Sequence, residues 1–116
     1  MLGVMTDQAP PGVIPYVEHH AGARRLLTLE LTSGNAVAVS RHRPIVGIDG
    51  RPYLVVWGPV TFEVPADRSV HVSVHVEADY VTQTASMLLP PGPGPLGYRY
   101  ETHYTSGVGT LSPLGG

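Results

Sequence analysis

The sequence contains neither cysteine nor lysine. Without cysteine, the chain has no disulfide framework and no thiolate ligand for a metal. Its seven cations are all arginine and stand against nine acidic residues, so the formal net charge is −2. This balance lacks the basic excess that nucleic acids and anionic membrane surfaces attract. We therefore expect no nucleic-acid partner.

Long apolar runs are missing as well. No segment approaches the ~18 apolar residues that a membrane-spanning helix needs. Residues 1–10 carry neither the cationic start nor the apolar core of a signal peptide. We expect a cytoplasmic protein without a membrane span, and 116 residues predict a single domain.

Apolar and polar side chains alternate without exception from residue 70 to residue 78. In a β-strand, successive side chains point to opposite faces of the sheet. The apolar face consists of Val70, Val72, Val74, Val76 and Ala78, and the polar face consists of His71, Ser73, His75 and Glu77. This pattern predicts a strand with one buried face in an antiparallel sheet.

Fourteen glycines and twelve prolines divide the rest of the chain into short segments. These segments read as about seven to nine strands without useful helical periodicity. The prediction is an all-β fold, an antiparallel two-sheet sandwich of Ig-like or PEGA-like type, with a small β-barrel as the alternative. We expect one sandwich domain at 24–112, a flexible or edge-strand segment at 1–23 and a disordered tail at 113–116.

Tight turns predict how some of these strands pair. The dipeptide Asp49-Gly50 is the strongest hairpin signal and joins residues 45–48 to residues 53–57. The apolar run 53–57 predicts a central strand. A second turn at 33–35 predicts a hairpin between residues 27–31 and 36–40.

The last clear strand is expected at residues 98–104, and residues 105–116 are expected to fray.

Aromatic residues are few, and we expect most of them in the core. The predicted core aromatics are Tyr53, Trp57, Tyr98, Tyr100 and Tyr104. A sugar-binding platform is the functional alternative, and it requires three of these rings to be exposed and coplanar.

Residues 44–112 carry several short motifs in a defined order. They are Ile48-Asp49-Gly50-Arg51-Pro52, Trp57-Gly58, Phe62-Glu63-Val64-Pro65-Ala66-Asp67-Arg68, the His/Val alternation, Pro90-Pro91-Gly92, Leu96-Gly97-Tyr98-Arg99-Tyr100 and Gly109-Thr110-Leu111. In this order they resemble a family of small actinobacterial β-sandwich proteins with a PEGA-like pattern. The chain departs from the family at Asp67, where glycine is usual, although aspartate also tolerates a left-handed turn. The resemblance implies a sandwich and carries over no activity.

Histidines on the polar strand face are the main candidates for chemistry. Imidazole and carboxylate groups together suit zinc, nickel or copper. His75 and Glu77 lie within reach of one ion, while His71 is too far along the strand to share it. His103, on the expected tyrosine-rich strand, is the natural third ligand. The alternative to a metal site is that these histidines only form a solvated face of the sheet. In that case no cofactor is expected.

Two further clusters carry weaker signals. Glu18-His19-His20 could chelate a metal only within a turn, because adjacent side chains point apart in an extended chain. The arginines at 24–25 and 41–43 are too few for a nucleic-acid footprint; they could meet an anionic partner, but a solvated surface is the favoured interpretation. Serine-hydrolase, phosphate-loop and zinc-protease motifs are absent, so no catalytic residue is assigned.

The sequence therefore favours a non-catalytic binding or assembly module. Exposed sheet edges readily pair with another chain. We expect a homo-oligomer or a protein partner, bound through sheet edges or the histidine-bearing face. The first alternative is a metal-binding or pH-responsive module built on His71, His75, Glu77 and His103. The second is a carbohydrate-active or hydrolytic enzyme.

Overall fold

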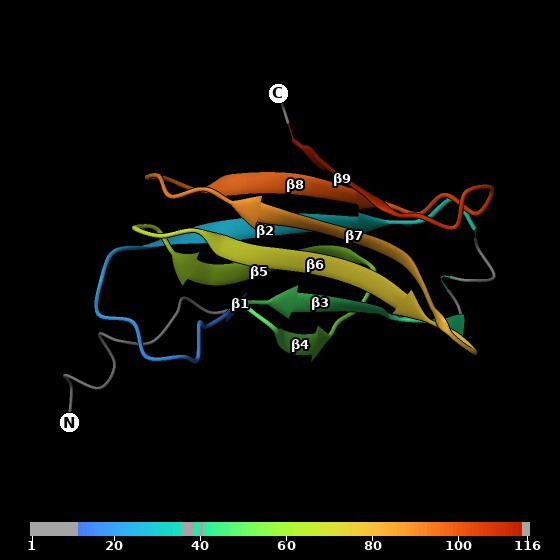
Figure 1. The fold of residues 1–116 in the computed structure, drawn as a ribbon, viewed down its shortest axis with the longest axis horizontal. Helices are drawn as coiled ribbons and strands as arrows, with labels where there is room; N and C mark the ends of the chain where they lie inside the picture. The colour runs from blue at the N-terminus through green and yellow to red at the C-terminus, as the bar shows by residue number, and fades with distance from the viewer. Residues whose placement is uncertain (1–11, 36–38, 40, 115–116) are drawn as a thin grey trace.

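Nine β-strands form two sheets in the computed structural model, which describes residues 12–35, 39 and 41–114. The five-stranded sheet has the order β1-β5-β2-β8-β9, and the four-stranded sheet has the order β4-β3-β6-β7 (Figure 1). The strands are β1 (Val13–Ile14), β2 (Arg24–Thr32), β3 (Pro44–Ile48), β4 (Arg51–Leu54), β5 (Gly58–Pro65), β6 (Val70–Glu77), β7 (Val81–Leu89), β8 (Leu96–Glu101) and β9 (Thr110–Pro113).

The two sheets pack face to face as a sandwich, which confirms the predicted fold class. They do not close into a barrel, because each sheet keeps two free edge strands. Outside the named strands, a single parallel bridge between Thr84 and Val108 links the two sheets at one side. The five-stranded sheet is mixed, since β2 pairs with β8, and β1 with β5, in parallel.

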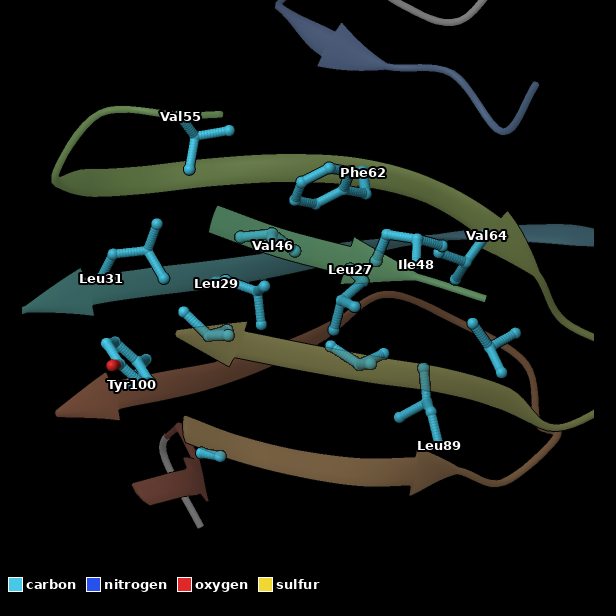
Figure 2. Packing of buried hydrophobic residues seen from close by; sticks show 14 of the residues in the cluster. Leu27, Leu29, Leu31, Val46, Ile48, Val55, Phe62, Val64, Leu89 and Tyr100 are labelled. Atoms are coloured by element: carbon cyan, nitrogen blue, oxygen red, sulfur yellow. The ribbon is translucent and has the colours of Figure 1, made fainter. Parts of the chain in front are cut away.

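The core lies between the sheets and is aliphatic with a few rings. In Figure 2, Val46 and Ile48 of β3 lie opposite the leucines of β2 and Phe62 of β5. The buried cluster consists of Tyr16, Leu27, Leu29, Leu31, Val46, Ile48, Val55, Phe62, Val64, Val70, Val72, Val74, Ala85, Leu89 and Tyr100. Inward-facing residues of both sheets thus form one continuous core.

Strand β6 confirms the alternation that defined the fold class. Val70, Val72, Val74 and Val76 are at most 1% exposed, while the residues between them face solvent to varying degrees. The Asp49-Gly50 hairpin is also confirmed between β3 and β4, with Ile48 opposite Arg51. Both turn residues have positive φ, 48° for Asp49 and 85° for Gly50, as a type I′ turn requires.

The prediction of a central strand at residues 53–57 is wrong. Strand β4 ends at Leu54 and forms an edge of its sheet. Leu54 is 60% exposed and Val56 is 62% exposed. The last hydrogen bond to β3 is the one that the Val55 N–H donates to the carbonyl of Pro44, and the chain bends away after it. An apolar run cannot distinguish a central strand from an edge strand followed by a bend.

The predicted hairpin between residues 27–31 and 36–40 is also wrong. Strand β2 pairs with β5 on one side and with β8 on the other, so both of its edges are already occupied. Residues 36–38 and 40 lie outside the described residues. Long-range pairing places β2 in the middle of its sheet, where Leu27, Leu29 and Leu31 on its inward face are at most 1% exposed.

The two ends of the chain contribute edge strands. Near the N-terminus, β1 pairs with β5, as expected of an edge-strand segment. The tyrosine-rich strand is shorter than predicted, because β8 ends at Glu101 and Tyr104 is 46% exposed. Residues 110–113, which were expected to fray, form β9 against β8.

Candidate functional site

The polar face of β6 brings two of the predicted metal ligands together. His75 Nε2 lies 3.2 Å from Glu77 Oε2. These residues are neighbours on one face because side chains two positions apart in a strand point the same way. His71 lies near the other end of β6, where its backbone N–H donates to Asp49 Oδ1 at 2.9 Å.

The fourth predicted ligand lies elsewhere. His103 follows β8, a strand of the other sheet. Its Nε2 is 3.0 Å from Thr110 Oγ1, and its backbone N–H donates to Gln83 Oε1 at 2.7 Å. Within residues 12–35, 39 and 41–114 there is no group of three or more histidine, aspartate or glutamate residues placed to hold a metal ion.

Histidine and glutamate near the N-terminus are used in separate ion pairs. Glu18 pairs with Arg51 at 2.7 Å. His20 Nε2 lies 3.1 Å from Asp67 and 3.2 Å from the Ala23 carbonyl oxygen. The segment therefore attaches to two different turns rather than folding around a common ion.

A second polar network fastens the same segment to the β3–β4 turn. The Tyr16 hydroxyl donates to Asp49 Oδ2 at 2.8 Å and accepts from Arg68. Burial, then the hydrogen bond to Asp49, raises the pKa of Tyr16 above its ordinary value. Asp49 thus links the β3–β4 turn to the start of β6 and to the N-terminal segment.

The two arginine clusters do not form one basic surface. Arg24 and Arg25 begin β2, whereas Arg41 and Arg43 follow its far end. Arg24 pairs with Glu63 at 2.8 Å. Arg25 is 8% exposed and donates to the Pro90 carbonyl, which fixes the proline-rich loop.

Sequence reasoning missed Gln83, the buried polar residue that organises one side of the sandwich. Gln83 is 1% exposed and has a φ of 59° within an irregularity of the β6–β7 ladder. Its side chain bonds both backbone polar groups of His103, and its backbone N–H donates to Gly107. The Tyr100 hydroxyl donates to the Gln83 carbonyl at 2.5 Å. The signal that the sequence offered for Gln83 was its position on the inward-facing side of β7.

Most predicted core aromatics do pack inward. Tyr100 is fully buried and stacks on Trp57, with ring centroids 6.5 Å apart. Tyr53 meets Phe62 edge to face at 5.4 Å. Tyr98 packs against the core, and only Tyr104 of the five is largely exposed. The three exposed coplanar rings that a sugar platform needs are not present among these residues.

Alkaline pH is expected to destabilise the protein through Tyr100. Burial, followed by the charge of Tyr104, raises the pKa of Tyr100 well above its ordinary value. The unfolded chain therefore ionises first, so this contribution to stability is complete below about pH 10 and is lost as pH rises further. In urea titrations at increasing pH, Tyr100→Phe should show a shallower loss of stability than the parent.

At neutral pH the same variant should be about 1–2 kcal/mol less stable, since it leaves the Gln83 carbonyl without its hydroxyl partner. Tyr80→Phe, at a position that is 70% exposed, is the control and should keep the parent's pH profile. Equal alkaline slopes for Tyr100→Phe and the parent would contradict the assignment.

Comparisons with known protein families, with curated proteins and with solved structures found no match. The part of the chain that the structure describes contains no helix long and apolar enough to cross a membrane.

Proposed function

We propose that the protein is a non-catalytic β-sandwich module that self-associates through the edge of β7. Edge strands present unpaired backbone N–H and C=O groups, and these groups template pairing with another chain. Natural edges are usually protected by short length, charge or proline. The observation that carries the proposal is that β7 has none of these protections.

Three of the four edge strands in the described residues are protected. Strand β1 has only two residues. Strand β4 is four residues long and contains Arg51 and Pro52. Strand β9 is also four residues long and ends at Pro113. Each offers little backbone to a second chain.

Strand β7 differs in length and in composition. It has nine residues, Val-Thr-Gln-Thr-Ala-Ser-Met-Leu-Leu, with no charge and no proline. Its first half is covered, because Gln83 bonds Gly107 and Thr84 bridges to Val108. In the described residues, positions 85–89 have no further backbone pairing on this side, although β9 packs close to β7, and we call them the open half of β7.

The open half of β7 suits a symmetric dimer. Two copies related by a two-fold axis can pair their open halves in antiparallel fashion, since a two-fold interface matches each patch with itself. The two four-stranded sheets would then continue into one sheet. Leu88, which is 66% exposed on the outer face, would lie next to the axis and lose water contact.

The test is sedimentation velocity over a wide range of protein concentrations. The parent should reach twice its 12.3 kDa chain mass. Leu88→Lys should remain at the chain mass, because two added cations would meet near the axis and lysine protects natural edges. Leu54→Lys is the matched control, since Leu54 is 60% exposed at the opposite edge of the same sheet.

Leu54→Lys should associate like the parent, and both variants should keep the parent's circular dichroism. A parent that stays monomeric at every concentration contradicts the proposal. So does equal association of the two lysine variants, which would move the contact away from β7.

A metal site gains no comparable support. Only His75 and Glu77 are brought together, and structural sites for zinc use four ligands. For the enzymatic alternative, one hollow is lined by two carboxylates, Glu18 and Asp49, but both are already engaged, Glu18 by Arg51 and Asp49 by Tyr16.

A further inference from the structure

Three connections gather at one end of the sandwich, where a pocket opens. They are the described residues 33–35 and 41–43 between β2 and β3, the β6–β7 turn and the loop between β8 and β9, all on the right in Figure 1. The pocket has a volume of about 250 Å³. Its walls include Asn35, Arg41, His42, Tyr80, Thr82 and Tyr104. Loops at the end of a sandwich are positioned by a rigid scaffold and so suit ligand binding.

The pocket combines an apolar floor with exposed rings. Val76 lines the pocket but is only 1% exposed, so it belongs to the sandwich core beneath. Tyr80 is 70% exposed and Tyr104 is 46% exposed. Tyrosine presents a large, stiff and amphipathic surface at low cost in conformational entropy, which is why it is frequent in binding loops. Two such rings around one small pocket favour a flat ligand.

The charge of the pocket comes from Arg41. Arg24, Arg51, Arg68 and Arg99 each lie within ion-pair distance of a carboxylate. Arg25 and Arg43 donate to backbone carbonyl oxygens. Within the described ranges, Arg41 has no such partner, and it is exposed at the pocket.

Hydrogen bonds hold the backbone that follows Arg41. The Trp57 indole N–H donates to the His42 carbonyl at 2.7 Å. Arg43 Nε donates to the Val55 carbonyl at 3.2 Å, and the Val55 N–H donates to Pro44. A fixed backbone reduces the ordering cost of presenting the guanidinium to a ligand.

We propose that this end pocket binds a small ring compound that carries one carboxylate. The ring lies against Tyr80 and Tyr104, and the carboxylate accepts two N–H bonds from the Arg41 guanidinium. Such paired bonds match the fork of arginine to the planar carboxylate. The volume limits the ligand to about one six-membered ring, below the ~300 Å³ of typical drug-sized sites.

The proposal goes beyond self-association and does not depend on it. The pocket lies beside the covered start of β7, whereas the contact proposed above uses the open half of β7. Leu88→Lys should therefore bind the ligand as the parent does. Loss of dimerisation and loss of ligand binding are then distinguishable results.

The experiment is an NMR titration of the ¹⁵N-labelled protein with two acidic probes, glucuronate and benzoate, and with their neutral counterparts, glucose and benzyl alcohol. At least one acid should shift the amides of Tyr80, Thr82 and Tyr104 in a saturable way. Binding of glucuronate alone identifies a sugar acid, and binding of benzoate alone identifies an aromatic acid. Both results support the site.

Arg41→Gln should weaken acid binding by about tenfold or more, because it removes the charged hydrogen bonds. Tyr80→Ala should weaken it by several-fold through lost ring contact. Arg99→Gln is the matched control and should leave affinity unchanged, since Arg99 lies on β8 and pairs with Glu30. The proposal is overturned if neither acid binds, if the neutral probes bind equally well, or if Arg41→Gln binds like the parent.

Discussion

Phe62→Ala is expected to lower the free energy of unfolding by about 3–5 kcal/mol, the range for removing a buried phenylalanine. Phe62 is 1% exposed, lies opposite Leu27 across the β2–β5 ladder and meets the ring of Tyr53. The strands around Phe62 are held in place by their own hydrogen-bond ladders, so they cannot move in to fill the cavity that the alanine leaves. Urea unfolding followed by tryptophan fluorescence measures the change.

This loss is large because a domain of this size is stabilised by only about 5–15 kcal/mol. Phe62→Leu keeps most of the buried volume and should lose much less. Val56→Ala, at a position 62% exposed, should change stability by about 0.5 kcal/mol or less. A small effect of Phe62→Ala, close to that of Val56→Ala, would contradict the packing of β5 against the core.

Gly109→Ala is expected to cost about 3 kcal/mol, at the upper end for overpacking a tight site. A Cβ at this position would lie 2.4 Å from the Gln83 carbonyl oxygen and 2.6 Å from the Tyr100 ring. Neither neighbour can retreat easily, since the Tyr100 hydroxyl bonds that same carbonyl. The variant must therefore push the loop before β9 away from β7. Urea unfolding again reports the loss.

Gly34→Ala provides the control for this backbone substitution. Apart from its two chain neighbours, no heavy atom of the described residues lies within 4 Å of a Cβ built at Gly34, and the φ of Gly34 is not in the left-handed region. Its stability should stay within about 0.5 kcal/mol of the parent. If the two alanine variants proved equally stable, the close approach of Gly109 to Gln83 would be refuted.

Local pattern predicted the sandwich because two strong signals depend on nearest neighbours in sequence. Alternation placed the valines of β6 inward, and Asp49-Gly50 located the β3–β4 turn. Both signals arise from backbone geometry within a few residues. Pairing of β2 with β5 and β8 depends on residues far apart in sequence, and no local pattern encodes it. The predicted hairpin at residues 27–40 failed for that reason.

Candidate sites were harder to predict than strands. Spacing within β6 correctly placed His75 beside Glu77. It could not place His103, because which sheet carries β8 is a property of the whole topology. Gln83 and the end pocket likewise assemble from separate segments. Nothing in the sequence indicates that Arg41 is the arginine that lacks a carboxylate or carbonyl partner in the described part of the chain.

The central position of β2 also has a consequence for synthesis on the ribosome. Thr32 bonds the carbonyl of Tyr100, a residue 68 positions later in the chain. Until β8 leaves the exit tunnel, the edge of β2 that pairs with β8 stays open, although β5 can already pair with the other edge. The five-stranded sheet must therefore be completed late in translation, and a ribosome that stalls before residue 96 holds a chain that is prone to aggregate.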